Sequence, residues 1–169
     1  MALLTANELI EIAVRIEEGG EEFYTTAAAK ASTAEIKALF DDLAAQERQH
    51  RDAFRQMGQA LRLGSGQAGA QSLELILAPD QWDEFQAYVG ALLDQSFFAG
   101  PDKALTRAAE ARDEREALQA AVSFEKETLL FYHELRDVVR GVGQQAVAEI
   151  MQQEKEHIQR LVGTLRKRQ

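Results

Sequence analysis

The sequence contains no cysteine, only two prolines and few aromatic residues. Without cysteine the chain has no disulfide, no thiolate metal site and no thiol nucleophile. The scarcity of proline, together with abundant Ala, Leu, Glu and Gln, favours an all-helical protein. A chain of 169 residues fits a single domain over 1–169.

Composition and charge also argue against membrane insertion, nucleic-acid binding and export. No apolar run approaches the roughly 20 residues that a membrane helix needs. A formal net charge of −9 opposes binding to nucleic acid or to an anionic membrane surface. The first residues, MALLTANEL, lack the basic start and apolar run of a signal peptide. We therefore expect a cytoplasmic protein with no nucleic-acid partner and no membrane partner.

Helical patterns separated by turn residues predict two helical hairpins in an all-α protein. The first covers about 5–58 with its turn near Ser32, and the second covers about 113–168 with GVG (141–143) as its turn. A long crossover, 59–112, joins them. Two hairpins with short turns and one long connection predict an antiparallel four-helix bundle.

The crossover is predicted to be partly helical. One helix is expected over about 80–98, stopped by Gly100 and Pro101, and a short helical piece follows from Asp102. The aromatic residues of this segment are Trp82, Phe85, Tyr88, Phe97 and Phe98. We expect them to pack on the bundle core, with a subunit interface as the alternative.

The two hairpins repeat each other. EEGGEEFY (17–24) matches EKETLLFY (125–132) at an offset of 108 residues, and QERQH (46–50) matches QEKEH (153–157) at an offset of 107. Because residues three, four and seven apart share a helix face, each copy places a Glu and a Glu-x-x-His on an otherwise apolar face. One Glu-x-x-His alone is a weak motif, which a surface pair or a hydrogen-bonded core His explains. Two copies favour a shared site.

The heights of these residues along the bundle also agree. In antiparallel helices, residues equidistant from the turn lie side by side. Ser32 is the midpoint between Glu17 and Glu47, and the midpoint between Glu125 and Glu154 falls at the second turn. The residues expected to meet in the middle of the bundle are Glu17, Glu47, His50, Glu125, Glu154 and His157.

A buried cluster of four carboxylates needs positive charge. Without partners each would cost several kcal/mol or would take up a proton. Two divalent metal ions balance four carboxylates while both imidazoles stay neutral. Oxygen and nitrogen donors without thiolate suit iron or manganese, and zinc also fits. One Glu from each of two helices and one Glu-x-x-His from each of the others is a di-iron arrangement of helical bundles.

Neighbouring residues carry further expectations. Tyr24 and Tyr132 are predicted to be core aromatics whose hydroxyls bond a ligand carboxylate two turns away on the same face. Gly19 and Gly20 cost helix stability, so they indicate close packing, or room beside the metals for a small oxidant. His133 has no Glu three residues before it and is predicted to lie on the surface.

At these residues the chain resembles the rubrerythrin branch of the ferritin-like superfamily. The E-x6-Y and E-x-x-H elements occur twice, in the family's order, from Glu17 to His157. The resemblance implies a ferritin-like four-helix bundle, a homodimer, and two iron ions held by the six residues named above, with Glu47 and Glu125 bridging. These residues would act in catalysis through the metals. The implied reactants are ferrous iron and peroxide or dioxygen.

The chain departs from its relatives at several positions. Bacterioferritins share this ligand set and bind haem through a Met directly after the helix-2 Glu, but this chain has Arg48 there, so no haem is expected. Without cysteine there is no rubredoxin centre, so electrons must come from an external donor. Rubrerythrins use an extra carboxylate on the third helix. Here Thr128 stands three residues after Glu125, and Glu127 would reach the metals only through a π-bulge.

Three functions remain open at this point. The first is a non-haem di-iron oxidoreductase of the ferroxidase or peroxidase type. The second is an iron storage or buffering protein, which would need a hollow assembly rather than a dimer. The third is a helical interaction bundle whose metal is structural, and metal-dependent redox turnover would separate the first two from it.

Overall fold

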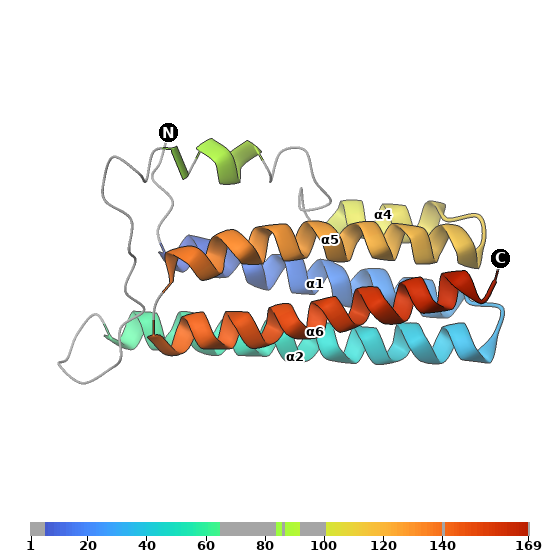
Figure 1. The fold of residues 1–169 in the computed structure, drawn as a ribbon, viewed down its shortest axis with the longest axis horizontal. Helices are drawn as coiled ribbons and strands as arrows, with labels where there is room; N and C mark the ends of the chain where they lie inside the picture. Colours follow the sequence, from blue (N-terminus) through green and yellow to red (C-terminus); the bar gives the residue numbers. More distant parts are fainter. Residues whose placement is uncertain (1–5, 65–83, 86, 92–100, 140, 169) are drawn as a thin grey trace.

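The protein is an α-helical bundle. The computed structural model describes residues 6–64, 84–85, 87–91, 101–139 and 141–168. The helices over these residues are α1 (Ala6–Lys30), α2 (Ala34–Gly64), α4 (Pro101–Glu110), α5 (Glu114–Val138) and α6 (Gly141–Arg166). Four of them are long and lie side by side, while the shorter α4 runs along the outside of α1 (Figure 1). The all-α bundle predicted from composition and periodicity is confirmed.

The long helices pair as two antiparallel hairpins. α1 and α2 form the first, and α5 and α6 form the second, with the two hairpin turns at opposite ends of the bundle (Figure 1). The hairpins pack so that α1 contacts α5 and α2 contacts α6. Each helix therefore has an antiparallel neighbour in its own hairpin and another in the opposite hairpin.

Two helix boundaries differ from the predicted hairpins. The helix α2 continues past Gly58 to Gly64, because Gly58 is buried and tertiary packing offsets the cost of roughly 1 kcal/mol for an interior glycine. The predicted turn GVG instead forms the first residues of α6. Glycine costs less there, because its penalty comes from lost backbone freedom and the terminal turn of a helix frays and keeps part of that freedom.

Apolar residues fill the bundle on both sides of a polar layer. One core cluster includes Leu9, Ile16, Phe54, Leu135 and Val147. The other includes Phe23, Ile36, Phe40, Leu118 and Leu161. Each cluster draws on both hairpins. On α1, α2 and α6 the buried charged side chains lie between the two clusters in sequence, so the two cores hold this polar layer in place.

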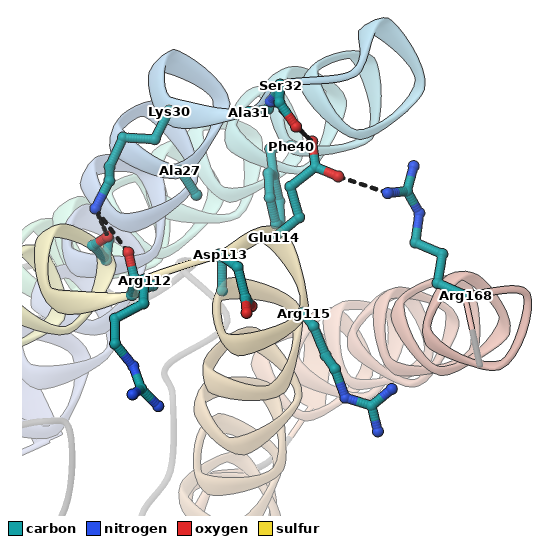
Figure 2. A pocket seen from close by; sticks show the side chains of 13 residues that line it. Ala27, Lys30, Ala31, Ser32, Phe40, Arg112, Asp113, Glu114, Arg115 and Arg168 are labelled. Carbon is teal, nitrogen blue, oxygen red and sulfur yellow. Dashed lines mark hydrogen bonds and ion pairs between the residues drawn. The ribbon is translucent and has the colours of Figure 1, made fainter.

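The first hairpin turn is fastened to the second hairpin by Glu114 (Figure 2). One carboxylate oxygen of Glu114 accepts hydrogen bonds from the backbone amides of Ser32 and Thr33, at 2.8 and 2.9 Å, just before α2 begins. The other oxygen accepts from Arg168 at 2.5 Å. A carboxylate at this end of α2 also interacts favourably with the helix dipole. These bonds fix the relative height of the two hairpins.

A cavity of about 470 Å³ opens at the same end of the bundle. Its wall includes Phe40, Lys30, Arg115 and Arg168 (Figure 2). The ammonium group of Lys30 donates to the carbonyl oxygen of Ala111 at 2.9 Å and so holds the residue that follows α4. None of the buried glutamates or histidines lines this cavity. The polar layer is therefore a separate, interior feature.

The crossover is partly helical, as predicted. α4 begins at Pro101, and proline is well suited to a first helical position because its missing amide hydrogen would have no partner there. Residues 84–85 and 87–91 are also helical. Phe85 packs on the first core cluster, whereas Tyr88 is 44 % exposed. Trp82, Phe97 and Phe98 lie outside the described residues.

Among the described residues, no helix combines the length and the apolar character needed to cross a bilayer.

Candidate metal centre

The six residues that the sequence places at one height do meet in the middle of the bundle. They come from all four long helices, one each from α1 and α5 and two each from α2 and α6. Five of the side chains have no exposed surface, and His50 is 3 % exposed. The residues are Glu17, Glu47, His50, Glu125, Glu154 and His157.

The donor atoms of these residues form two groups. Within each group, one atom from every residue lies within 4.8 Å of the others. The first group is Glu17, Glu47, His50 and Glu154, and the second is Glu47, Glu125, Glu154 and His157. Glu47 on α2 and Glu154 on α6 therefore belong to both groups. The family resemblance implied Glu47 and Glu125 as the bridging residues, but Glu125 belongs to the second group alone.

The hydrogen bonding of the cluster is incomplete. Eight buried atoms of these residues have no hydrogen-bond partner: both carboxylate oxygens of Glu47 and Glu154, one oxygen each of Glu17 and Glu125, and Nδ1 of both histidines. A buried polar atom without a partner costs about 1–3 kcal/mol, and more when it is charged. Eight such atoms facing one another fit the binding of cations. The donor set of carboxylate oxygen and imidazole nitrogen suits iron or manganese.

Each histidine is oriented by a glutamine from the opposite hairpin. The Nε2 atom of His50 lies 2.7 Å from the amide oxygen of Gln153, and Nε2 of His157 lies 3.1 Å from the amide oxygen of Gln46. Because an amide oxygen only accepts, Nε2 carries the proton in both rings. The Nδ1 atoms then face the carboxylates. Nδ1 of His50 lies 2.9 Å from Oε1 of Glu154, and Nδ1 of His157 lies 2.8 Å from Oε2 of Glu154. Neither contact has the alignment of a hydrogen bond.

These two glutamines were missed from the sequence. Both Glu-x-x-His motifs begin with Gln directly before the Glu, as QERQH and QEKEH show. This shared residue was the available signal. Metal-binding histidines commonly donate their second N–H to such an outer partner, which fixes the ring and its tautomer.

The two tyrosines bond buried carboxylates of the other hairpin. Tyr24 on α1 donates to Oε1 of Glu125, and Tyr132 on α5 donates to Oε1 of Glu17. The expectation of a partner on the same helix was wrong, since seven residues span about 10 Å of helix. In the antiparallel packing of α1 on α5, each Tyr lies at the height of the opposite Glu. Burial raises the pKa of both phenols well above the usual value, so they remain donors.

The charges of the metal-free cluster follow from burial and from the imidazoles. Burial raises the pKa of Glu47 and Glu125 well above the usual value, and the charge of Glu154 adds to this. Burial also raises the pKa of Glu17. Glu154 is the exception: burial opposes its ionisation, but contacts with both histidines hold its pKa well below normal.

The histidines respond in the opposite sense. Burial alone would lower the pKa of His50, but its contacts with Glu154 and Glu17 raise it to about 12. The pKa of His157 is raised in the same way by Glu125, Glu154 and Glu47. Without metal, both imidazoles are therefore positively charged, and some of the carboxyl groups are protonated and neutral. Cations that bind there must displace these protons.

Gly20 packs directly against the cluster. A Cβ atom added to it would lie 3.0 Å from Cε1 of Phe124 and closer still to Oε2 of Glu47. The expectation of close packing is confirmed at this position. The alternative of free space for an oxidant does not fit, because the carboxylate of Glu47 lies against the glycine.

Other polar residues singled out by the sequence lie outside the two groups. α5 is a regular α-helix throughout, and Glu127 is half-buried on it and belongs to neither group. His133, predicted to be on the surface, is also half-buried. Arg48 is exposed and forms an ion pair of 2.7 Å with Glu21. Thr128 is fully buried next to the cluster along α5.

Four antiparallel helices around two carboxylate–histidine groups that share two glutamates define a di-metal carboxylate protein. The chain belongs to the rubrerythrin family, whose model matches residues 8–96. It is also similar to a protein of Thermotoga maritima described as a ferritin-like diiron-carboxylate protein, with 27 % sequence identity and a TM-score of 0.67 over 100 % of this chain and 99 % of that chain. No curated protein is significantly similar to it in sequence.

Proposed function

We propose that this protein binds two iron ions and couples the oxidation of ferrous iron to the reduction of peroxide or dioxygen. The observation that carries the proposal is the set of eight buried donor atoms without hydrogen-bond partners. They converge from two hairpins on two positions. The similarity to a protein described as a diiron-carboxylate protein supports iron over manganese or zinc.

The two groups of donor atoms assign a role to each residue. Glu17 and His50 would hold one ion, and Glu125 and His157 would hold the other. Glu47 and Glu154 would serve both ions, because each belongs to both groups. When bound, two ferrous ions supply the two electrons that reduce one hydrogen peroxide, together with two protons, to two water molecules.

The remaining parts of the site position these ligands. Tyr24 and Tyr132 each hold one oxygen of a terminal glutamate. Gln46 and Gln153 keep Nδ1 of each histidine directed at the carboxylates. The apolar clusters on both sides exclude bulk water, so the charges act at low dielectric. The ligands are therefore largely preorganised.

Repeated turnover requires an electron donor outside this chain. The 169 residues contain no cysteine for a rubredoxin centre. We propose that a separate redox protein reduces the centre, and that the protein acts as a homodimer. Iron storage is the second candidate, since it uses the same oxidation step but needs a hollow assembly. A structural metal in an interaction bundle is the third.

Metal analysis of anaerobically purified protein tests the proposal. After loading with ferrous iron, elemental analysis is expected to approach two ions per chain, and Glu47→Ala or Glu154→Ala is expected to lose both, since each removes a shared ligand. A folded wild-type protein that binds no metal would refute the proposal. Native mass then separates a dimer from a cage. Two bound ions that never change oxidation state would instead favour the structural role.

A further inference from the structure

The side chain of Thr128 is an unexplained part of the polar layer. It lies one helical turn after Glu125 on α5 and has no exposed surface. Helical threonines often bond the carbonyl oxygen one turn earlier, but the Oγ1 atom of Thr128 has no hydrogen-bond partner. A buried hydroxyl without a partner is rare in folded proteins and destabilises them. This hydroxyl is therefore able to bond a partner that is not part of the protein.

The repeat in the sequence shows what is unusual about this position. Glu17 and Glu125 are equivalent in the two hairpins, so Gly20 is the equivalent of Thr128. Gly20 lies against the carboxylate of Glu47, which leaves no space for a side chain. In the second hairpin, Glu154 directs its two oxygens at the histidines instead, at 2.9 and 2.8 Å.

The two halves of the site are therefore unequal. In the first half a bridging carboxylate lies directly on the backbone of α1. In the second half a fully buried hydroxyl, three residues from a ligand glutamate, remains unpaired. Oε2 of Glu125 in this half also has no hydrogen-bond partner. A hydroxyl can both donate and accept a hydrogen bond, so it can bind a small molecule that accepts one, donates one or does both.

We propose that Thr128 is a positioning residue whose hydroxyl bonds the small ligand that enters the metal centre beside Glu125. Suitable ligands are water, peroxide, and small anions such as azide. The inference rests on the proposed function, because the ligand binds to the metals. The inference places this ligand in the second half of the centre, beside Glu125 and Thr128.

Azide titration of the iron-loaded, oxidised protein tests the role of Thr128. The variants are Thr128→Val, which removes only the hydroxyl, and Thr128→Ser, which keeps it. Thr164→Val is the matched control, since its hydroxyl bonds the carbonyl oxygen of Arg160 at 2.9 Å on α6. Visible absorption gives the azide Kd. We expect a Kd about tenfold higher in Thr128→Val and nearly unchanged values in the serine variant and the control.

Thermal unfolding of the metal-free proteins supplies a second measurement. Replacing an unpaired buried hydroxyl by a methyl group of the same shape is neutral or stabilising, so the Tm of Thr128→Val should equal or exceed that of wild type. A lower Tm together with an unchanged azide Kd would show a structural role and overturn the inference. Thr128→Ala replaces the valine variant if the latter does not fold.

Metal content distinguishes this inference from the proposed function. If wild type binds no iron, the proposed function fails, and the inference fails with it. If wild type and Thr128→Val both bind two ions per chain and have the same azide Kd, only the inference is overturned. A weaker azide complex at unchanged metal content supports it.

Discussion

The Nε2 atom of His50 on α2 lies 2.7 Å from the amide oxygen of Gln153 on α6. The bond crosses between the two hairpins, and its counterpart joins His157 to Gln46 in the reverse direction. Each Glu-x-x-His motif is therefore completed by the glutamine that precedes the other one. A histidine held in this way presents a defined nitrogen to a metal before the metal arrives.

Removing this bond should weaken metal binding. In Gln153→Leu the Nε2–H of His50 loses its acceptor, so the ring is free to change tautomer or rotate. We expect the metal affinity to fall about 10- to 100-fold, measured by competition with a chelator of known affinity. Gln152→Leu is the control, because Gln152 is exposed and bonds Glu156 rather than a histidine. Equal affinities in the two variants would argue against this role of Gln153.

Gly20 should be intolerant of even one added methyl group. Gly20→Ala pushes the carboxylate of Glu47 away from the α1 backbone and out of the position shared by both groups. We expect the variant to fold, to lose about 1–3 kcal/mol of stability through overpacking, and to bind fewer than two ions per chain. Gly163→Ala on α6 meets open space and should gain up to about 1 kcal/mol with normal metal content. Full metal loading of Gly20→Ala would contradict the expected displacement.

The tyrosine hydroxyls should contribute equally and independently. Tyr24→Phe leaves Oε1 of Glu125 without its donor, and Tyr132→Phe does the same to Glu17. A net hydrogen bond of about 1 kcal/mol corresponds to roughly a fivefold loss of metal affinity in each variant. The double variant should show the product of the two effects. Tyr88→Phe, at an exposed position, is the control, and an effect as large there would point to a non-specific cause.

The metal-free protein should lose stability as pH rises from 5 to 8. The raised pKa values of Glu17, Glu47 and Glu125 mean that protonation favours the folded state. This contribution is complete below the ordinary value of 4.5 and is lost as pH rises through the raised values. His50 acts in the same direction between 6.5 and about 12. Glu154, whose pKa is lowered, contributes above 4.5 and stays ionised throughout this range.

Melting curves with and without metal check this expectation. The Tm of the metal-free protein should be several degrees lower at pH 8 than at pH 5. Metal binding releases protons, so the stabilisation by metal should grow over the same range. A metal-free Tm that rises steadily from pH 5 to pH 8 would contradict the assigned directions.

Peroxide consumption should stop after one turnover. Two ferrous ions deliver two electrons, and no donor is evident within this cysteine-free chain. Mixing the ferrous-loaded protein with excess peroxide in a stopped-flow instrument should therefore consume about one peroxide per chain and then end. A small reductant or redox protein should restart the reaction. Continued loss of peroxide without a donor would indicate catalase-like cycling instead.

The sequence was sufficient for the fold class and for the buried residues that converge in the bundle. Periodic apolar faces interrupted at Glu17, Glu47, Glu125 and Glu154 predicted both the bundle and the residues that meet in it. This works because helix geometry is local: residues three, four and seven apart share a face whatever the helix packs against. The repeat then fixed the heights, since antiparallel hairpins pair residues at equal distances from their turns.

The pairing of side chains between hairpins could not be read in this way. The expected partners of the tyrosines are carboxylates on their own helices, and the resemblance implies Glu125 rather than Glu154 as a bridging residue. The tyrosine partners depend on which helices of the two hairpins are neighbours, and the shared glutamates depend on how the side chains are directed between them. Sequence spacing carries no information on that, because it depends on how the two apolar cores pack together.

The sequence by itself determined that four glutamates and two histidines would be buried at one level of a helical bundle, because each lies on an apolar helical face. Only the tertiary structure decided which atoms of these residues face one another. The packing of α1 on α5 gives each tyrosine its glutamate, and the directions of the Glu47 and Glu154 side chains make them common to both groups. The tertiary structure also places the carboxylate of Glu47 against Gly20, where a side chain would exclude it.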